Sequence, residues 1–135
     1  MASRRKGRIA AFQALYAMDM GASKECLDFS WTHSDDAPEP EWLLFSRLLF
    51  DGTVEQLEVI DDEIKKHLEH WDIGRIRKID LAILRLSVYA LMFQSGIPAT
   101  VTIDEAVHLA KEFSTDDSYR FINGVLDAVY HSQGG

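Results

Sequence analysis

The chain has 135 residues, 47% of them apolar and 27% charged, which is the size and composition of a single globular domain. This composition excludes a disordered, collagen-like or disulfide-framework protein, and the single cysteine, Cys26, excludes an intrachain disulfide or a zinc site with several cysteines. One cysteine suits a reducing, cytoplasmic compartment, and the sequence has no run of about 18 apolar residues to span a membrane.

The net charge of −8 is unevenly distributed along the chain. Residues 1–18 contain four basic and no acidic residues, residues 19–72 contain 4 basic and 15 acidic residues, and residues 73–135 contain 6 basic and 7 acidic residues. The molecule as a whole therefore repels a polyanion, which can bind only at a local basic patch. The N-terminal cluster of Arg4, Arg5, Lys6 and Arg8 is the clearest such patch.

Apolar residues at helical spacing predict the elements of the first half. The first helix runs from Ser3, a candidate N-cap, to Met20, and Gly21 stands in the position that ends it. A short helix over Ser23–Phe29 and an acidic loop follow. A long helix then runs from Pro40 toward Leu68, and Gly52 is the candidate point for a bend or a break.

The second half has a connecting turn or short helix at residues 71–76 and then a nearly all-apolar helix, Asp80–Phe93, which we expect at the centre of the fold. Gly96 and Pro98 end it. Thr102 and Glu105 have the spacing of a capping box, so a helix should start at Thr102 and run to Phe113. With a last helix over Asp117–His131, the sequence predicts an all-α fold of six or seven helices.

Asn123 and Gly124 lie inside the last helix, where a glycine costs about 1 kcal/mol relative to alanine. Close packing of the Gly124 backbone against another helix would compensate for this cost. Alternatively, the amide of Asn123 orients a functional loop. Both explanations are open, since the two residues can have different roles.

Two segments admit a binding role beside an ordinary structural one. Thr115 or Asp116 can simply cap the last helix, but Tyr119 and Arg120 add a ring and a cation that suit an unpaired base and a phosphate. The N-terminal basic cluster can be a solvated, frayed terminus, or it can bind RNA together with the amide of Gln13 and the ring of Tyr16.

The sequence gives little support to a metal site or an enzyme. Glu63, His67 and His70 could share one helix face, but no fourth ligand is evident, and Cys26 and His33 are close only in sequence. The acidic run at residues 61–63 is more typical of a solvated helix face than of a catalytic pair. No glycine-rich phosphate loop is present, so we expect no cofactor.

Several strings resemble, in order along the chain, the bacterial transcription antitermination family NusB. They are Arg4-Arg5-Lys6 with Arg8, Gln13-Ala14-Leu15-Tyr16, Ile83-Leu84-Arg85-Leu86, Ile103-Asp104-Glu105-Ala106-Val107 and Phe121-Ile122-Asn123-Gly124-Val125-Leu126-Asp127. Each string is weak alone, and the ordered set is specific. Asp104 stands where the family usually has Asn, and Ala90 stands where it usually has Glu, which removes a carboxylate that a partner could bind.

The resemblance implies two small packed helical subdomains, at about residues 1–70 and 71–135, and no enzymatic activity. It also implies binding of single-stranded boxA RNA, together with the ribosomal small-subunit protein NusE, in the transcription elongation complex. The implied RNA-binding residues are Arg4, Arg5, Lys6, Arg8, Gln13, Tyr16, Lys111, Asp117, Ser118, Arg120 and Asn123. Asp80 occupies a position linked to partner binding, and Arg85 is expected to be structural.

An alternative from another class is a helical interaction or dimerisation module that binds no RNA and whose basic cluster is idle. A homodimer is open under either interpretation. Loss of RNA binding on removal of the basic cluster would distinguish the two functions.

Overall fold

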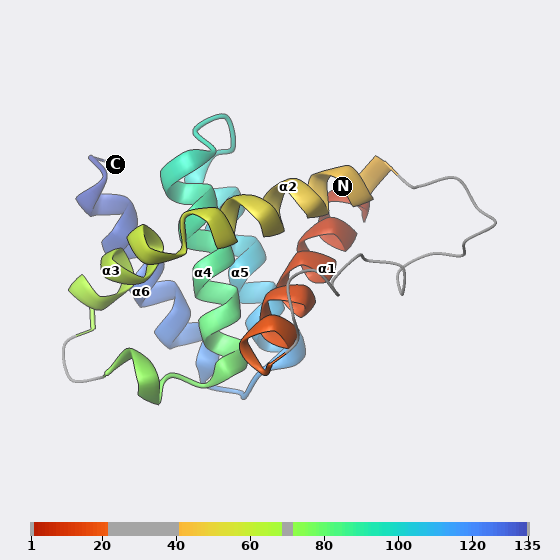
Figure 1. Cartoon of the computed structure of the whole chain (residues 1–135). Coiled ribbons are helices and arrows are strands. Elements are labelled where there is room, and N and C mark those ends of the chain that lie inside the picture. Colours follow the sequence, from red (N-terminus) through yellow and green to blue (C-terminus); the bar gives the residue numbers. More distant parts are fainter. Residues whose placement is uncertain (1, 22–40, 69–71, 135) are drawn as a thin grey trace.

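The computed structural model describes residues 2–21, 41–68 and 72–134 (Figure 1). Its elements are six α-helices and one short 3-10 helix: α1 Ala2–Asp19, α2 Glu41–Glu55, α3 Leu57–Lys66, η3 Ile73–Arg75, α4 Lys78–Phe93, α5 Ala99–Phe113 and α6 Ser118–Ser132. The described residues contain no strand, so the all-α prediction is confirmed. The short helix predicted at Ser23–Phe29 and the acidic loop after it lie outside the described residues.

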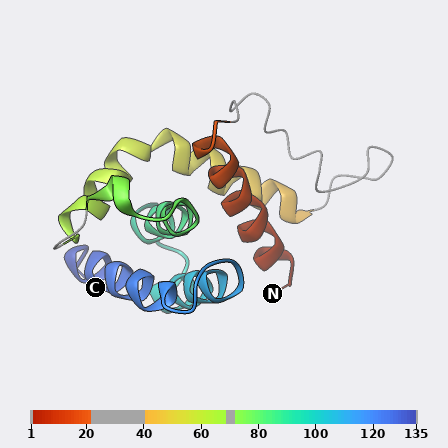
Figure 2. The same cartoon turned by 90° about the horizontal axis from the view of Figure 1, so that it is seen from below.

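Helix α4 is the centre of the molecule, as its apolar sequence predicts. Figure 2 looks along α4 and shows the other helices arranged around it, and α1, α2, α3, α5 and α6 all contact it. From Asp80 to Ala90 no residue of α4 is exposed. Buried apolar residues from all six α-helices therefore join in one core.

Two predicted helix starts are wrong. Helix α1 begins at Ala2, so Ser3 lies inside it and is not its N-cap. Helix α5 begins at Ala99, because the N–H groups of Val101 and Thr102 already donate to the carbonyl of Pro98. The string that resembles a capping box lies within the helix, where Thr102 is buried. At the other end of α1, Gly21 has a φ of +113°, which agrees with its predicted role in ending the helix.

The predicted roles of the two glycines Gly52 and Gly124 are also wrong. The long second helix breaks at Gln56, and Gly52 lies within α2, where a Cβ would overlap the Tyr89 hydroxyl group. The close helix approach expected at Gly124 thus occurs at Gly52, between α2 and α4. Gly124 is exposed, and a Cβ there would have no atom within 4 Å.

The acidic run at residues 61–63 is not a solvated face. Asp61 accepts two hydrogen bonds from Arg85 of α4, at 2.9 and 2.8 Å, and only Asp62 is exposed. Burial alone would lower the pKa of Arg85, but its bonds to Asp61 and the charge of Asp19 outweigh burial and raise it. Arg85 therefore stays charged and ties α4 to α3 and to the end of α1, which is the structural role expected for it.

Glu63 joins α3 to the C-terminal end of α6. Its carboxylate, 7% exposed, lies 2.9 Å from His67 Nε2, 3.3 Å from Lys66 Nζ and 3.0 Å from Ser132 Oγ. Burial alone raises the pKa of this carboxyl, but the hydrogen bonds from His67, Ser132 and Lys66 outweigh burial and lower the pKa. Glu63 and His67 are thus a hydrogen-bonded pair, and the described residues include no cluster of metal ligands.

None of the described helices is long and apolar enough to cross a membrane.

The two glycines give opposite predictions for stability. Gly124→Ala should raise the free energy of unfolding by about 1 kcal/mol, because it removes the cost of a mid-helix glycine and meets no neighbour. Gly52→Ala should lower it by about 1 to 3 kcal/mol, because the new methyl group overlaps the Tyr89 ring. Denaturant unfolding of both variants tests this. A loss of stability in Gly124→Ala would show that this face of α6 is not open.

The Glu63 junction predicts a pH-dependent contribution to stability. A lowered carboxyl pKa stabilises the fold above the ordinary value of 4.5, and this contribution is lost as the pH falls through the lowered value. Glu63→Gln should therefore destabilise the protein at pH 6, and the difference from the parent should shrink toward pH 3. Glu58→Gln changes an exposed carboxylate of the same helix and is the matched control. A difference that is independent of pH would contradict the assignment.

Candidate nucleic-acid interface

The basic residues at the start of α1 lie against aromatic residues of α2. The Arg4 guanidinium is 4.9 Å from the centre of the Phe45 ring, and Lys6 Nζ is 6.0 Å from the centre of the Trp42 ring. Arg4, Arg5 and Lys6 are all exposed. The cation–π contacts orient Arg4 and Lys6 and leave their charges in solvent, where an anion can reach them. We call these three residues the basic ridge.

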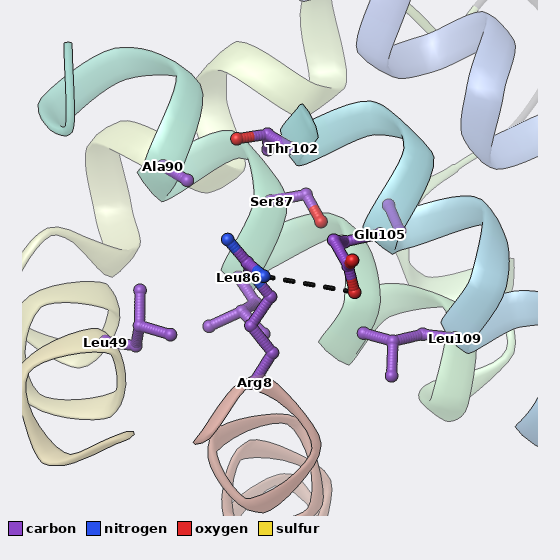
Figure 3. A pocket seen from close by; sticks show the side chains of 9 residues that line it. Arg8, Leu49, Leu86, Ser87, Ala90, Thr102, Glu105 and Leu109 are labelled. Carbon is purple, nitrogen blue, oxygen red and sulfur yellow. Dashed lines mark ion pairs between the residues drawn. The ribbon is translucent and has the colours of Figure 1, made fainter. Parts of the chain in front are cut away.

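Arg8 differs from the basic ridge because it points into the protein. Its side chain is 12% exposed and forms an ion pair with Glu105 of α5 at 3.9 Å (Figure 3). Burial lowers the pKa of Arg8, and the charge of Glu105 opposes this. Ala90, which departs from the family pattern, lines the same small pocket. Arg8 therefore holds α1 to α5 and is a poor candidate for direct contact with RNA.

The basic ridge adjoins the start of α6 through the last turns of α5. Arg5 forms an ion pair with Glu112 at 3.6 Å, and Lys111, the residue before Glu112, lies with its Nζ 4.7 Å from the centre of the Tyr119 ring. Figure 2 shows the N-terminal end of α1 beside α5. The two regions singled out by the sequence thus lie on one surface.

Tyr119 contacts two cations at the start of α6. One is Lys111, over the ring. The other is Arg120, whose Nε donates to the Tyr119 hydroxyl at 3.1 Å and whose guanidinium is 5.6 Å from the ring centre. The Tyr119 hydrogen bond, with the charges of Tyr119 and Asp117, raises the pKa of Arg120. The ring and both cations suit a base and its phosphates.

Gln13 and Tyr16 are half-buried on the second half of α1. Tyr16 lines an open groove of about 510 Å³ together with Phe113 and Thr115. The Phe12 and Phe113 rings, 5.3 Å apart, hold this part of α1 against the end of α5. Tyr16 therefore faces the α5–α6 junction, residues 114–117, which leads to Tyr119.

Ser118 and Asp80 are interior residues. The hydroxyl groups of Ser114 and Ser118 donate to the two carboxylate oxygens of Asp80, at 2.5 and 2.9 Å, and Asp80 is only 4% exposed. Thr115 Oγ1 lies 2.8 Å from Ser118 Oγ. This network fixes the start of α6 on α4. Both residues are thus placed where they shape the interface and are covered by protein themselves.

The remaining predicted residues of α6 have different positions. Asp117 is exposed at the N-cap of α6 and makes no hydrogen bond there through its side chain, so plain side-chain capping does not account for it. The half-buried Asn123 donates from Nδ2 to Asp127 within its own helix, at 3.4 Å. The amide of Asn123 thus makes its bond along α6 and not to a loop.

The sequence analysis missed a second group of cations, Arg75, Arg77 and Lys78, all of them exposed. Averaging charge over residues 73–135 concealed them. Three basic residues within four positions, directly before a central helix, were the available signal. It also missed Trp42 and Phe45, which orient the basic ridge and carry no charge pattern.

A family model described as the NusB family matches residues 5–131. The transcription antitermination protein NusB of Treponema pallidum (strain Nichols) is 53% identical over 131 residues, which cover 96% of this chain and 93% of that protein. The NusB structure of T. maritima has 35% identity and a TM-score of 0.83, and covers 95% of this chain and 90% of that one. A structure of NusB and NusE in complex with dsRNA has 28% identity and a TM-score of 0.86, with 98% of each chain covered.

The Asp80 network predicts a local effect on the interface. Asp80→Ala should lower the free energy of unfolding by about 1 to 3 kcal/mol, because the Ser114 and Ser118 hydroxyls lose their acceptor. It should also speed amide hydrogen exchange at the α5–α6 junction more than in α2. Asp62→Ala, an exposed site with the same change in charge, is the control. Unchanged exchange at the junction would show that Asp80 does not hold it.

Proposed function

Since the chain belongs to the NusB family, we propose that it is a transcription antitermination factor that binds single-stranded boxA-type RNA and a NusE partner. In this role it keeps the RNA in the elongating polymerase complex, and no catalytic step is assigned to it. The solved neighbour of NusB and NusE with dsRNA supports both kinds of partner.

The observation that carries the proposal is the continuous surface from the basic ridge to Tyr119. Arg5, Glu112 and Lys111 link the two regions without a break, in a protein whose net charge is −8. A single strand crossing this surface can place its phosphates on the ridge and stack a base beside Tyr119. Tyr16 and Asp117 line the two grooves beside this surface and can contact base edges, and Gln13 precedes Tyr16 by one turn of α1.

The other predicted residues support the interface from behind. The Arg8–Glu105 pair holds α1 in place, and the Asp80–Ser118 bond holds the start of α6. The role that the resemblance implied for Asp80 in partner binding is then an indirect one, through the position of the junction. The bond from Asn123 to Asp127 stabilises the turn of α6 that follows Arg120.

The acidic part of the chain suits a basic partner. Residues 19–72 contain 15 acidic and 4 basic residues, so a ribosomal protein with a positive surface is attracted to this segment while free RNA is repelled. NusE is the partner that the solved neighbour contains.

The basic ridge gives the direct test. In Arg4→Ala/Arg5→Ala/Lys6→Ala, binding of boxA RNA should weaken, and the slope of log K against log salt should fall by roughly 2, at about 0.7 per lost phosphate contact on a single strand. Arg8 is left in place because its removal would leave the half-buried Glu105 carboxylate without its ion pair. Gel-shift titrations over a range of salt, with and without NusE, measure both effects.

The control is Lys65→Glu, which lowers the net charge by 2 at an exposed position of α3 and leaves the Lys66–Glu63 pair intact. A scrambled RNA separates sequence-specific binding from general attraction. If the ridge variant binds boxA RNA as the parent does, the basic ridge does not contribute to RNA binding. A protein–protein interaction module that does not bind RNA then becomes the better interpretation.

A further inference from the structure

The cations that precede α4 differ in how they are paired. Lys78 Nζ lies 3.5 Å from Asp19 Oδ2 and is partly neutralised. Arg75 ends η3 and Arg77 is the N-cap of α4, and both are exposed. In the part of the chain that the structure describes, neither arginine has an ion pair.

Arg75 and Arg77 form one wall of a groove of about 610 Å³. The opposite wall is the α5–α6 junction and the start of α6, with Thr115, Asp117 and Phe121. Arg77 and Thr115 also line the groove of about 510 Å³ that contains Tyr16, so the two grooves meet there. Each has the volume of a site for a small organic group.

The lining of the larger groove selects among ligands. An apolar molecule would leave two arginines without a counter-charge, and an anion without hydrogen-bond donors, such as a free polyphosphate, would leave the exposed carboxylate of Asp117 on the other wall without a partner. A nucleotide of a single strand satisfies both walls. Its phosphates face the arginines, its base rests on Phe121, and an amino group of the base can donate to Asp117.

We propose that the RNA strand continues from the basic ridge across the α5–α6 junction into this groove, where Arg75 and Arg77 bind its phosphates. The inference rests on the proposed RNA-binding function. It extends the interface by two arginines that neither the summed charge of residues 73–135 nor the resemblance to the NusB family indicated. The groove makes binding dependent on RNA length, because a strand that ends at Tyr119 does not reach Arg77.

The test uses the full chain and a nested series of boxA RNAs, extended by one nucleotide at a time from either end. For the parent, affinity should rise in a step when one end reaches the groove. For Arg75→Ala/Arg77→Ala this step should be absent, and the slope of log K against log salt on the longest RNA should fall by about 1.4. Arg75→Lys/Arg77→Lys keeps the charges and should keep most of the slope.

Lys65→Glu is the matched control, because it lowers the net charge by the same amount on α3, outside both grooves, and leaves the Lys66–Glu63 pair intact. Thermal unfolding of each variant verifies that it is folded. If the slope of log K against log salt falls equally in the control, the change in net charge alone explains the weaker binding, and the inference is overturned.

The outcomes also distinguish a failure of this inference from a failure of the proposed RNA-binding function. If the ridge variant loses affinity while Arg75→Ala/Arg77→Ala keeps the length step and slope of the parent, the groove is not part of the RNA path and the proposed function stands. If the parent itself binds no boxA RNA, with or without NusE, both are wrong.

Discussion

The fold depends on a helix that has no solvent face. Between Asp80 and Ala90 every residue of α4 is at least partly covered, so the other five α-helices must surround it. Apolar packing alone tolerates alternative arrangements of the covering helices. Two polar residues on α4 remove this freedom: Arg85 binds Asp61 of α3, and Asp80 binds Ser114 and Ser118 on either side of the α5–α6 junction. Charged hydrogen bonds have directions, and they set which face of each neighbour meets α4.

The exposed interface follows from these interior bonds. Asp80 determines where α6 begins, and so where Tyr119 and Arg120 stand. The Arg8–Glu105 pair does the same for α1, since it holds the first half of this helix against α5 (Figure 3). Arg4 and Arg8 lie one turn apart on the same face of α1, where both contact the Phe45 ring. Their different exposure therefore follows from their position along the helix, since Arg4 lies nearer its N-terminal end.

Prediction from sequence succeeded where the signal lies within one segment, and it failed where a contact with another helix determines the structure. The ends of α4 and α6 were placed within two residues, since apolar periodicity and end signals lie within those segments. The break at Gln56 has no breaker residue, and Gly52 stays helical because its missing side chain is needed for contact with Tyr89. The cluster around Arg4 was visible as charge, but only tertiary structure separates Arg8 from it. Arg75 and Arg77 acquire their proposed role only because the α5–α6 junction lines the same groove.

A protein with a net negative charge can bind RNA because salt screens electrostatic repulsion over a short distance. At physiological salt the Debye length is about 8 Å, so carboxylates farther from the strand than this are largely screened, while cations in contact act almost fully. In the proposed RNA complex, net charge therefore governs encounters with nonspecific polyanions, and the basic ridge governs the affinity of the bound strand. Because Arg5 is itself paired with Glu112 at 3.6 Å, a phosphate that binds there must compete with a carboxylate. This competition weakens attraction to any single phosphate and favours a strand that engages several cations at once.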